Sequence, residues 1–310
     1  MVQSEHLDGP LKGLRPARLK VGIVSAGRVG TALGVALERA DHVVVACSAV
    51  SAQSRRRAQR RLPDTVVLPV HEVAANSELL ILAVPDAELA TLVSGLAATA
   101  AVKPGTIVAH TSGANGVGVL APLAALGCIT LAIHPAMTFT GADEDIIRLS
   151  ETCFGITADD DIGYTIAQSL VLEIGGEPFR VREDARILYH AALAHAANHL
   201  VTVVVDALEA LRAALRGQEL LGQESIGEAP GGLAERIIGP LARAALDNCL
   251  QRGQAALTGP VARGDAAVVA GHLGALAEVE PALAEAYRVV SLRTAQRAHA
   301  PADIFEVLQK

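Results

Sequence analysis

The feature that most constrains the fold is a regular alternation of short apolar runs with longer helix-period segments in the first half of the chain. The apolar runs have strand length and no polar alternation, so we expect strands buried on both faces of a sheet. They lie at residues 20–24, 42–47, 79–84, 106–110, 129–134, 153–157 and 178–181. Helical periodicity marks residues 29–40, 52–62, 86–101, 116–126 and 162–174. This alternation predicts an α/β fold, a doubly wound parallel sheet with right-handed crossovers.

After residue 182 the strand-like runs stop and helical periodicity continues to the end. Helices are predicted over residues 184–215, 233–256, 265–277 and 281–298, with breaks at 217–232 and 258–264. We therefore predict a second, all-α domain. The predicted organisation is a loose N-terminal tail over 1–18, an α/β domain over 19–182 and a helical domain over 183–310.

Composition excludes several classes of protein. Of the 310 residues, 51% are hydrophobic and 19% are charged, so the chain can bury enough apolar surface to fold. A net charge of -7 and only 2% aromatic residues argue against a nucleic-acid partner. The most apolar segment, residues 191–211, contains histidines and acidic residues and is interpreted as a core helix, which predicts no membrane partner. The first residues lack a secretion signal, so we expect a cytoplasmic protein.

Neither the cysteines nor the histidines predict a metal site or a disulfide framework. The four cysteines are scattered without C-x-x-C spacing. His195 and His199 have the spacing of a helical metal pair, but no carboxylate at ligand spacing and no other His or Cys cluster accompanies them. We therefore predict no metal.

The strongest chemical signal is the junction of the first strand and first helix, LKVGIVSAGRVGTAL, at residues 19–33. Free amides at a helix start bind phosphate, Gly27 would let a pyrophosphate approach, and Gly30 would let the helix pack on the strand. Ser25 stands where the first glycine of G-x-G-x-x-G belongs, a departure from that motif. An ordinary turn is the alternative. The predicted dinucleotide site comprises Ser25, Ala26, Gly27, Arg28, Val29 and Gly30.

The end of the second strand favours NADP over NAD. No acidic residue occurs from residue 43 to 61, although an acidic residue there usually binds the ribose hydroxyls of NAD. Side chains that would instead bind a 2′-phosphate are Ser48, Ser51, Arg55 and Arg56. The alternative is that most of the five arginines between residues 55 and 61 only form a solvated helix face.

Other strand ends should line the same groove, because ligands of open parallel sheets bind at the carboxyl ends of the strands. The predicted lining residues are Val84, Pro85, Asp86, Thr111, Ser112 and Gly113. His134 ends a further strand and is a candidate acid near the reacting carbon, or else a cap for buried carbonyl groups. His190 and Asn198 lie on one broad face of the long predicted helix, since they are eight residues apart.

The ordered motifs identify a family. GIVSAGRVGTAL, LAVPDAEL, HTSGANG, HPAMTF, YHAALAHAANHLVTV and ALTGPVARGD together resemble Rossmann-like proteins with an all-helical C-terminal domain of formerly unknown function. That family includes alternative ketopantoate reductases and is more distantly similar to pyrroline-5-carboxylate reductases and β-hydroxyacid dehydrogenases. The resemblance covers about residues 19–298. It implies a Rossmann doubly wound parallel sheet followed by an all-α domain, with substrate bound between the domains and homodimerisation through the helices.

The resemblance also implies an NADPH-dependent reductase of a small 2-oxo acid, with ketopantoate and pantothenate biosynthesis as the first candidates. The related dehydrogenases use a lysine on the long helix as the acid, and no lysine occurs from residue 184 to 215. His190 is the expected substitute and His134 the reserve. Asn198 would orient the substrate, and its carboxylate would be held by Thr258, Gly259 and Arg263. The alternatives are an imine reductase of the pyrroline-5-carboxylate type and a non-catalytic NADP-binding redox sensor.

Overall fold

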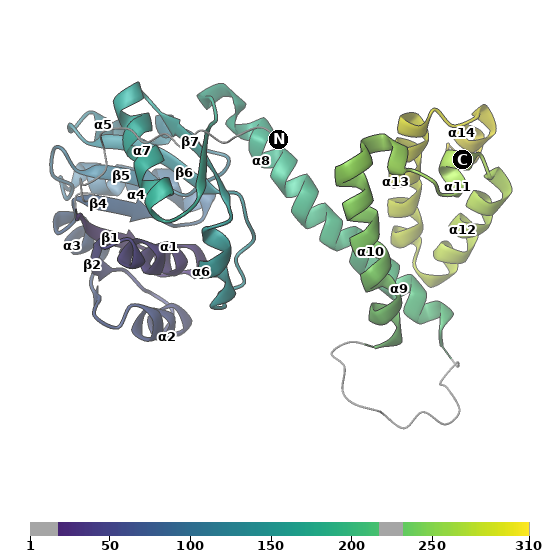
Figure 1. Ribbon diagram of the computed structural model, residues 1–310, viewed down its shortest axis with the longest axis horizontal. Coiled ribbons are helices and arrows are strands. Elements are labelled where there is room, and N and C mark those ends of the chain that lie inside the picture. The colour runs from purple at the N-terminus through teal and green to yellow at the C-terminus, as the bar shows by residue number, and fades with distance from the viewer. Residues whose placement is uncertain (1–17, 217–231, 310) are drawn as a thin grey trace, which may run out of the picture. The chain divides into compact units, whose positions relative to one another are not determined.

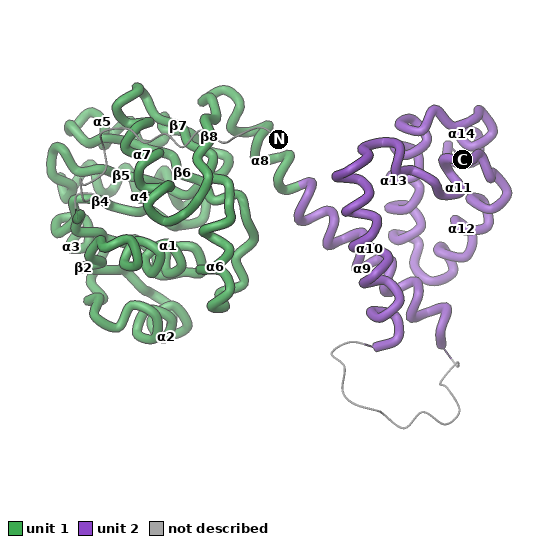
Figure 2. Tube along the Cα trace, in the orientation of Figure 1, with its two compact units in different colours: residues 1–194 green, residues 195–310 purple. Residues whose placement is uncertain are grey.

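A computed structural model describes residues 18–216 and 232–309 of the chain (Figure 1). They form two compact units, of which the first ends at Ala194 and the second begins at His195 (Figure 2). The boundary thus lies inside the long helical region, beyond residue 182. Apart from their last residues, the predicted tail over 1–18 and the predicted break over 217–232 lie outside the described residues.

Unit 1 is built on one eight-stranded sheet with the order β3-β2-β1-β4-β5-β6-β7-β8. The strands are β1 (Lys20–Val24), β2 (Val43–Cys47), β3 (Val66–Val67), β4 (Leu79–Leu82), β5 (Ile107–His110), β6 (Ile129–Pro135), β7 (Cys153–Ala158) and β8 (Glu177–Arg180). The strands β1 to β6 pair in parallel, and all four residues of the central strand β4 are buried. The predicted doubly wound α/β fold is confirmed.

Two strands run against the others, because β7 is antiparallel to β6, with Pro135 paired to Phe154, and β8 is parallel to β7. The only α-helix between β6 and β7 is α6 (Glu144–Leu149). Its six residues span about 9 Å, too little to run back along β6, which extends over roughly 23 Å. The chain therefore enters β7 at the same end of the sheet at which β6 finishes, and β7 runs in the opposite direction.

Helices cover both faces of the sheet. In unit 1 they are α1 (Arg28–Arg39), α2 (Ala52–Arg61), α3 (Val70–Ala75), α4 (Asp86–Ala98), η1 (Val117–Leu120), α5 (Ala121–Ala124), α6, α7 (Asp161–Glu173), η2 (Glu183–Ala185) and α8 (Arg186–Ala194). One apolar core joins the sheet to α1 and α7 through Leu37 and Leu170. The other core joins it to α4 and α5 through Leu89 and Leu123. The two cores lie on the two faces of the sheet. The carboxyl ends of the parallel strands are therefore available for a site.

Unit 2 consists of helices: η3, a π-helical segment (His195–His199), α9 (Leu200–Ala214), α10 (Leu233–Arg252), η4 (Gly253–Ala256), α11 (Pro260–Arg263), α12 (Ala266–Val279), α13 (Pro281–Ala298) and α14 (Ala302–Leu308). A small core around Val269 and Ile304 joins α12, α13 and α14. The continuous helix over Glu183–Ala214 is long and apolar enough to cross a membrane by length and composition alone, and its most apolar stretch is not buried. The interpretation of residues 191–211 as a core helix therefore does not hold within the described residues.

Candidate functional site

The turn after β1 has a left-handed residue at Ser25, where the dinucleotide-binding motif has its first glycine. Ser25 has a φ of +75°, in the left-handed region that favours glycine. Two hydrogen bonds hold it there, because the amide of Ser25 donates to the hydroxyl of Ser48 at 2.9 Å and the amide of Ala26 donates to the carbonyl of Ser48 at 2.7 Å. Ser48, predicted as a phosphate contact, thus also positions the turn.

Gly27 and Gly30 are glycines for different reasons. A Cβ at Gly30 would stand 2.3 Å from the carbonyl oxygen of Ser25, so only glycine lets α1 pack this closely on the turn. A Cβ at Gly27 would meet nothing nearer than the Ser25 hydroxyl at 3.5 Å, so protein packing alone does not require glycine there. The first-turn amides of α1 have no acceptor within the helix. The open side of Gly27 and these amides together suit a phosphate.

A cleft of about 680 Å³ opens at this turn. Of the predicted cofactor residues, it is lined by Ser25, Ala26, Gly27, Ser48, Ser51, Val84 and Pro85. It is also lined by Ser54, Arg57, Glu88 and Thr91, which the sequence analysis did not select. The structure therefore brings together the ends of β1, β2 and β4 around one cavity.

The arginines of α2 divide between this cleft and other contacts. Arg57 lines the cleft, whereas Arg55 lines a neighbouring cleft of about 540 Å³ and donates to the carbonyl of Ala49 at 3.2 Å. Arg56 is exposed. The pKa of Arg57 is lowered by burial and then by the positive charges of Arg28, Arg61 and Arg60. This concentration of positive charge beside the cleft favours an anionic group.

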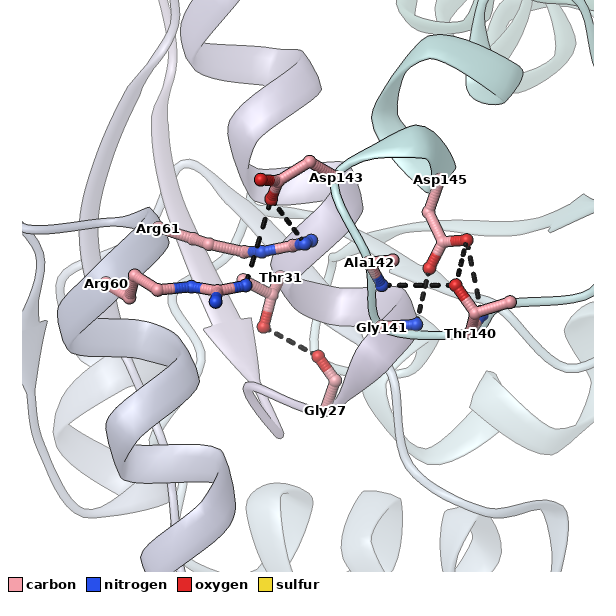
Figure 3. Close-up of polar contacts among 9 residues, drawn as sticks. All are labelled: Gly27, Thr31, Arg60, Arg61, Thr140, Gly141, Ala142, Asp143 and Asp145. Carbon is pink, nitrogen blue, oxygen red and sulfur yellow. Dashed lines mark hydrogen bonds and ion pairs between the residues drawn. The ribbon is translucent and has the colours of Figure 1, made fainter. Parts of the chain in front are cut away.

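The loop between β6 and α6 packs against the same arginines (Figure 3). Arg61 and Arg60 converge on Asp143, at 2.6 and 3.8 Å, and the Arg61 side chain is only 4% exposed. Asp145 accepts from the amide of Gly141 at 2.6 Å and so shapes the loop. Arg61 is therefore a structural contact, Arg60 is an exposed residue at ion-pair distance, and Arg57 is the arginine that lines the cleft.

A second cluster of side chains lies where β5, β6 and α8 meet. The Tyr189 hydroxyl is 2.8 Å from Nδ1 of His134, and the rings of His134 and His190 have centroids 6.2 Å apart. A Cβ at Gly113 would stand 2.7 Å from the His190 ring and 3.0 Å from Nε2 of His134. Both predicted acids and the predicted Gly113 loop thus come together within unit 1.

Arg186 anchors this cluster to the sheet. It is 1% exposed, and its guanidinium donates to the carbonyl oxygens of Ala132 and Gly155 at 3.1 and 3.0 Å and to the Thr157 hydroxyl at 2.7 Å. Burial lowers its pKa to about 10, so it stays charged near neutral pH. Tyr189 is one helical turn away and is positioned by this anchor.

Two histidines of this region, His110 and His134, are held uncharged at neutral pH. Burial, and then the charges of Arg186 and His190, lower the pKa of His134 to about 4. Burial likewise lowers the pKa of His110 to about 4. The hydrogen bond of its Nε2 to the carbonyl of Gly116 at 2.9 Å raises this pKa, but by less than burial lowers it. An uncharged imidazole at the end of β6 can donate or accept a hydrogen bond but brings no charge of its own.

The remaining predicted residues have different surroundings. Ser112 uses its hydroxyl to accept from the amide of Asn115 at 3.0 Å, and Asp86 is the exposed first residue of α4. Asn198, Thr258, Gly259 and Arg263 belong to unit 2 and are exposed. Arg263 donates to Asp265 at 2.8 Å and to the carbonyl of Thr258 at 2.6 Å. Among the described residues, no group of three His, Cys, Asp or Glu side chains is arranged to hold a metal ion.

Two families of domains match the chain. Residues 3–135 match a Rossmann-like domain, and residues 152–294 match a domain of unknown function, DUF2520. No curated protein matches it.

Solved structures with the same fold include a putative NADP oxidoreductase from Bacteroides fragilis, with 19% identity, a TM-score of 0.73, and coverage of 90% of this chain and 98% of that one. An imine reductase from Streptomyces aurantiacus has 14% identity and a TM-score of 0.62, covering 94% and 100%. A pyrroline-5-carboxylate reductase from Coxiella burnetii has 16% identity and a TM-score of 0.50, covering 91% and 99%.

Proposed function

Because the chain belongs to the family that joins a Rossmann-like domain to a DUF2520 domain, we propose that it is an NADPH-dependent oxidoreductase of small carbonyl compounds. The observation that carries this proposal is the turn over Ser25–Gly30, which combines a left-handed serine, a sterically open Gly27 and a cleft at the ends of three strands. The solved relatives, named as an NADP oxidoreductase and an imine reductase, support it.

The cleft suits NADP in charge as well as in shape. The turn and the start of α1 would hold the pyrophosphate. Ser51, Ser54 and Arg57 line the same cleft and would hold the 2′-phosphate, with Arg55 in the adjoining cleft as a further contact. When bound, NADPH supplies a hydride to the substrate carbon.

For the substrate we propose a small 2-oxo acid, with ketopantoate as the first compound to test. The carbonyl oxygen must gain a proton as the C=O bond is reduced, and His190 is the proposed donor. His134, held uncharged beside Gly113, is available as a hydrogen-bond donor. Asn198 and the turn over Thr258–Arg263 are proposed substrate contacts from unit 2.

The first experiment titrates NADPH into the wild-type protein and the Gly27→Ala variant. We expect the variant to fold, because its new Cβ meets nothing within 3.4 Å, and to bind NADPH at least about 10-fold more weakly, because the methyl group blocks the phosphate. Gly95→Ala is the matched control, since a Cβ there meets nothing within 4 Å. Unchanged NADPH affinity in Gly27→Ala would contradict the proposed cofactor site.

The choice of NADP over NAD is tested by Arg57→Ala, with Arg56→Ala as the control. Losing a charge-assisted contact to a phosphate costs about 1.5–3 kcal/mol, so NADPH affinity should fall about 10- to 100-fold in Arg57→Ala. NADH affinity should hardly change, and Arg56→Ala should match the wild type. Equal losses for both cofactors would show that Arg57 does not select the 2′-phosphate.

Reduction of a cyclic imine is the second candidate. A protonated imine needs no acid, which fits a cluster whose His134 is uncharged at neutral pH. Absorbance of NADPH is followed with ketopantoate and with pyrroline-5-carboxylate as separate oxidants. If NADPH is oxidised faster with ketopantoate and this activity is lost in His190→Gln, the substrate is a 2-oxo acid. If NADPH binds but is oxidised neither by these two compounds nor by a wider panel of 2-oxo acids and imines, a redox sensor is favoured.

We also propose that the protein forms a homodimer through unit 2. Large apolar side chains are exposed on α9 and α10, among them Val201 at 63%, Leu241 at 64% and Leu250 at 77%. Exposed apolar surface of this kind marks an association site. Light scattering of the wild type should give the mass of a dimer. The Leu241→Glu variant should give a smaller mass. A monomeric wild type that instead sediments with lipid vesicles would assign this surface to a membrane.

A further inference from the structure

Tyr189 is placed to control the chemistry of His134. Its ring lies between His134 and Phe179, with centroids 5.5 and 5.9 Å away, and its hydroxyl oxygen is 2.8 Å from Nδ1 of His134. A Cβ at Gly155 would come within 2.8 Å of that oxygen, so the glycine of β7 makes room for the phenol. No other hydrogen bond of the hydroxyl occurs among the described residues.

The chemistry of the two groups sets the direction of this hydrogen bond. A phenol O–H is a good donor, and the unprotonated nitrogen of a neutral imidazole is a good acceptor. When Nδ1 accepts from Tyr189, the proton of the neutral ring must be on Nε2, since one ring nitrogen is a donor and the other an acceptor. Nε2 of His134 has no hydrogen-bond partner among the described residues.

The surroundings keep the ring in this neutral form. The charged and titratable groups that face His134 are Arg186, His190, Asp86 and His110, and only Asp86 favours its protonation. Burial is the largest influence and also opposes a positive charge. Nε2 lies against Gly113, where a Cβ would be 3.0 Å from this nitrogen and 2.7 Å from the His190 ring, so both rings pack on the bare backbone of this loop.

We propose that Tyr189 is a positioning residue that fixes His134 as the neutral Nε2–H tautomer, so that His134 presents a hydrogen-bond donor beside Gly113. This role rests on the proposed function. The donor would bind the oxygen of the substrate carbonyl, on which negative charge develops during reduction. A donor held in place before the reaction is effective because it needs no reorganisation. His134 and His190 then have separate roles, as orienting donor and as acid.

Nitrogen-15 NMR of the histidine side chains tests the tautomer without any substrate. In the wild type near pH 7.5, His134 should show a protonated Nε2 and an unprotonated Nδ1, with its signals assigned by their loss in His134→Gln. In Tyr189→Phe the two nitrogen shifts should move toward each other, because both tautomers become populated. A protonated Nδ1 in the wild type, or unchanged shifts in Tyr189→Phe, would overturn the proposal.

The chain contains a matched control in unit 2. Nδ1 of His272 is 2.9 Å from the hydroxyl of Tyr287, with ring centroids 5.8 Å apart, which repeats the geometry of His134 and Tyr189. Tyr287→Phe should change the signals of His272 and leave those of His134 in place. A change of His134 in this variant as large as in Tyr189→Phe would mean that the NMR response reports general loosening and would also overturn the proposal.

Kinetics separates this inference from the proposed function. With an active substrate, Tyr189→Phe should lower kcat about 10-fold while the Kd of NADPH stays unchanged, a smaller loss than the roughly 100- to 1,000-fold caused by removing a donor outright. If no carbonyl or imine compound oxidises NADPH, the proposed function fails, and the NMR experiment still decides the tautomer. Unchanged kcat together with the expected NMR shifts would overturn the role in catalysis.

Discussion

The two units differ in where they keep their apolar side chains. In unit 1 the strands and the facing helices bury theirs in two cores, and residues such as Phe154 and Leu131 are 0% exposed. The described residues of unit 2 form a small core, and Leu241 and Leu250 are 64% and 77% exposed. Unit 1 therefore has the core of an independent domain, whereas unit 2 leaves large apolar side chains exposed, as the proposed homodimer requires.

The largest effect is expected from removing a buried side chain of unit 1. Phe154→Ala should lower the free energy of unfolding by about 3–5 kcal/mol, because it leaves a cavity in a closed core. Leu250→Ala should change it by less than about 0.5 kcal/mol in the monomer, because that side chain is already in solvent. Urea unfolding at low protein concentration measures both, and equal losses would show that the units do not differ in this way.

Acid should weaken unit 1 through His110 and His134. The pKa of both His110 and His134 is about 4 in the folded protein, against 6.5 as the ordinary value. Between these values only the unfolded chain takes up the protons, so stability is complete above pH 6.5 and falls as the pH is lowered to 4. Each histidine should contribute a loss of up to about 3 kcal/mol.

Urea unfolding of wild type and His110→Gln from pH 7.5 to 4 measures this contribution. The difference in unfolding free energy between the two proteins should change over this range and stay constant above pH 7. A constant difference at every pH would mean that His110 takes up its proton equally in the folded and unfolded states. His272→Gln in unit 2, where the histidine is exposed, is the control.

The order of strands and helices was predictable because each central strand is a continuous apolar run, as in Leu79–Leu82. The direction of β7 was not, because it depends on how far the short α6 reaches, and α6 itself has too few residues to show a period. The short elements β3 and α3 were missed for the same reason. Local pattern therefore predicts long elements and fails where tertiary geometry decides.

The candidate site was predictable at the turn and less so elsewhere. The glycines of the turn are visible in the sequence, and so are His134 and His190. Arg57 was not selected because one residue turns a helix by about 100°, so the choice among three consecutive arginines depends on how α2 packs. Tyr189 was missed as a site residue because its partner is 55 residues away in the chain. The available signal was its place as the first residue of the motif YHAALAHAANHLVTV.

A smaller effect is expected at the buried hydroxyl that holds the turn. Ser48→Ala leaves the amide of Ser25 without its acceptor at 2.9 Å, which should cost about 1–2 kcal/mol of folding stability. NADPH affinity should fall as well, because Ser25 loses the contact that favours its left-handed conformation. Ser54→Ala, in the first turn of α2, should leave the stability of unit 1 nearly unchanged. If Ser48→Ala retains full stability, the hydroxyl is not what fixes the turn.

The smallest effect on folding is expected at the turn of unit 2 that contains Arg263. Arg263 and Asp265 form an ion pair at 2.8 Å whose side chains are 59% and 38% exposed, so Arg263→Gln should cost less than about 1 kcal/mol. If Arg263 binds the substrate carboxylate as proposed, the KM for a 2-oxo acid should rise about 10-fold or more, with the Kd of NADPH unchanged. Asp265→Asn breaks the same pair and keeps the arginine, so it should not raise KM in the same way. A loss of stability above 1 kcal/mol with an unchanged KM would make Arg263 a structural residue of its turn, and unit 2 would then lack the charged contact that the proposed substrate needs.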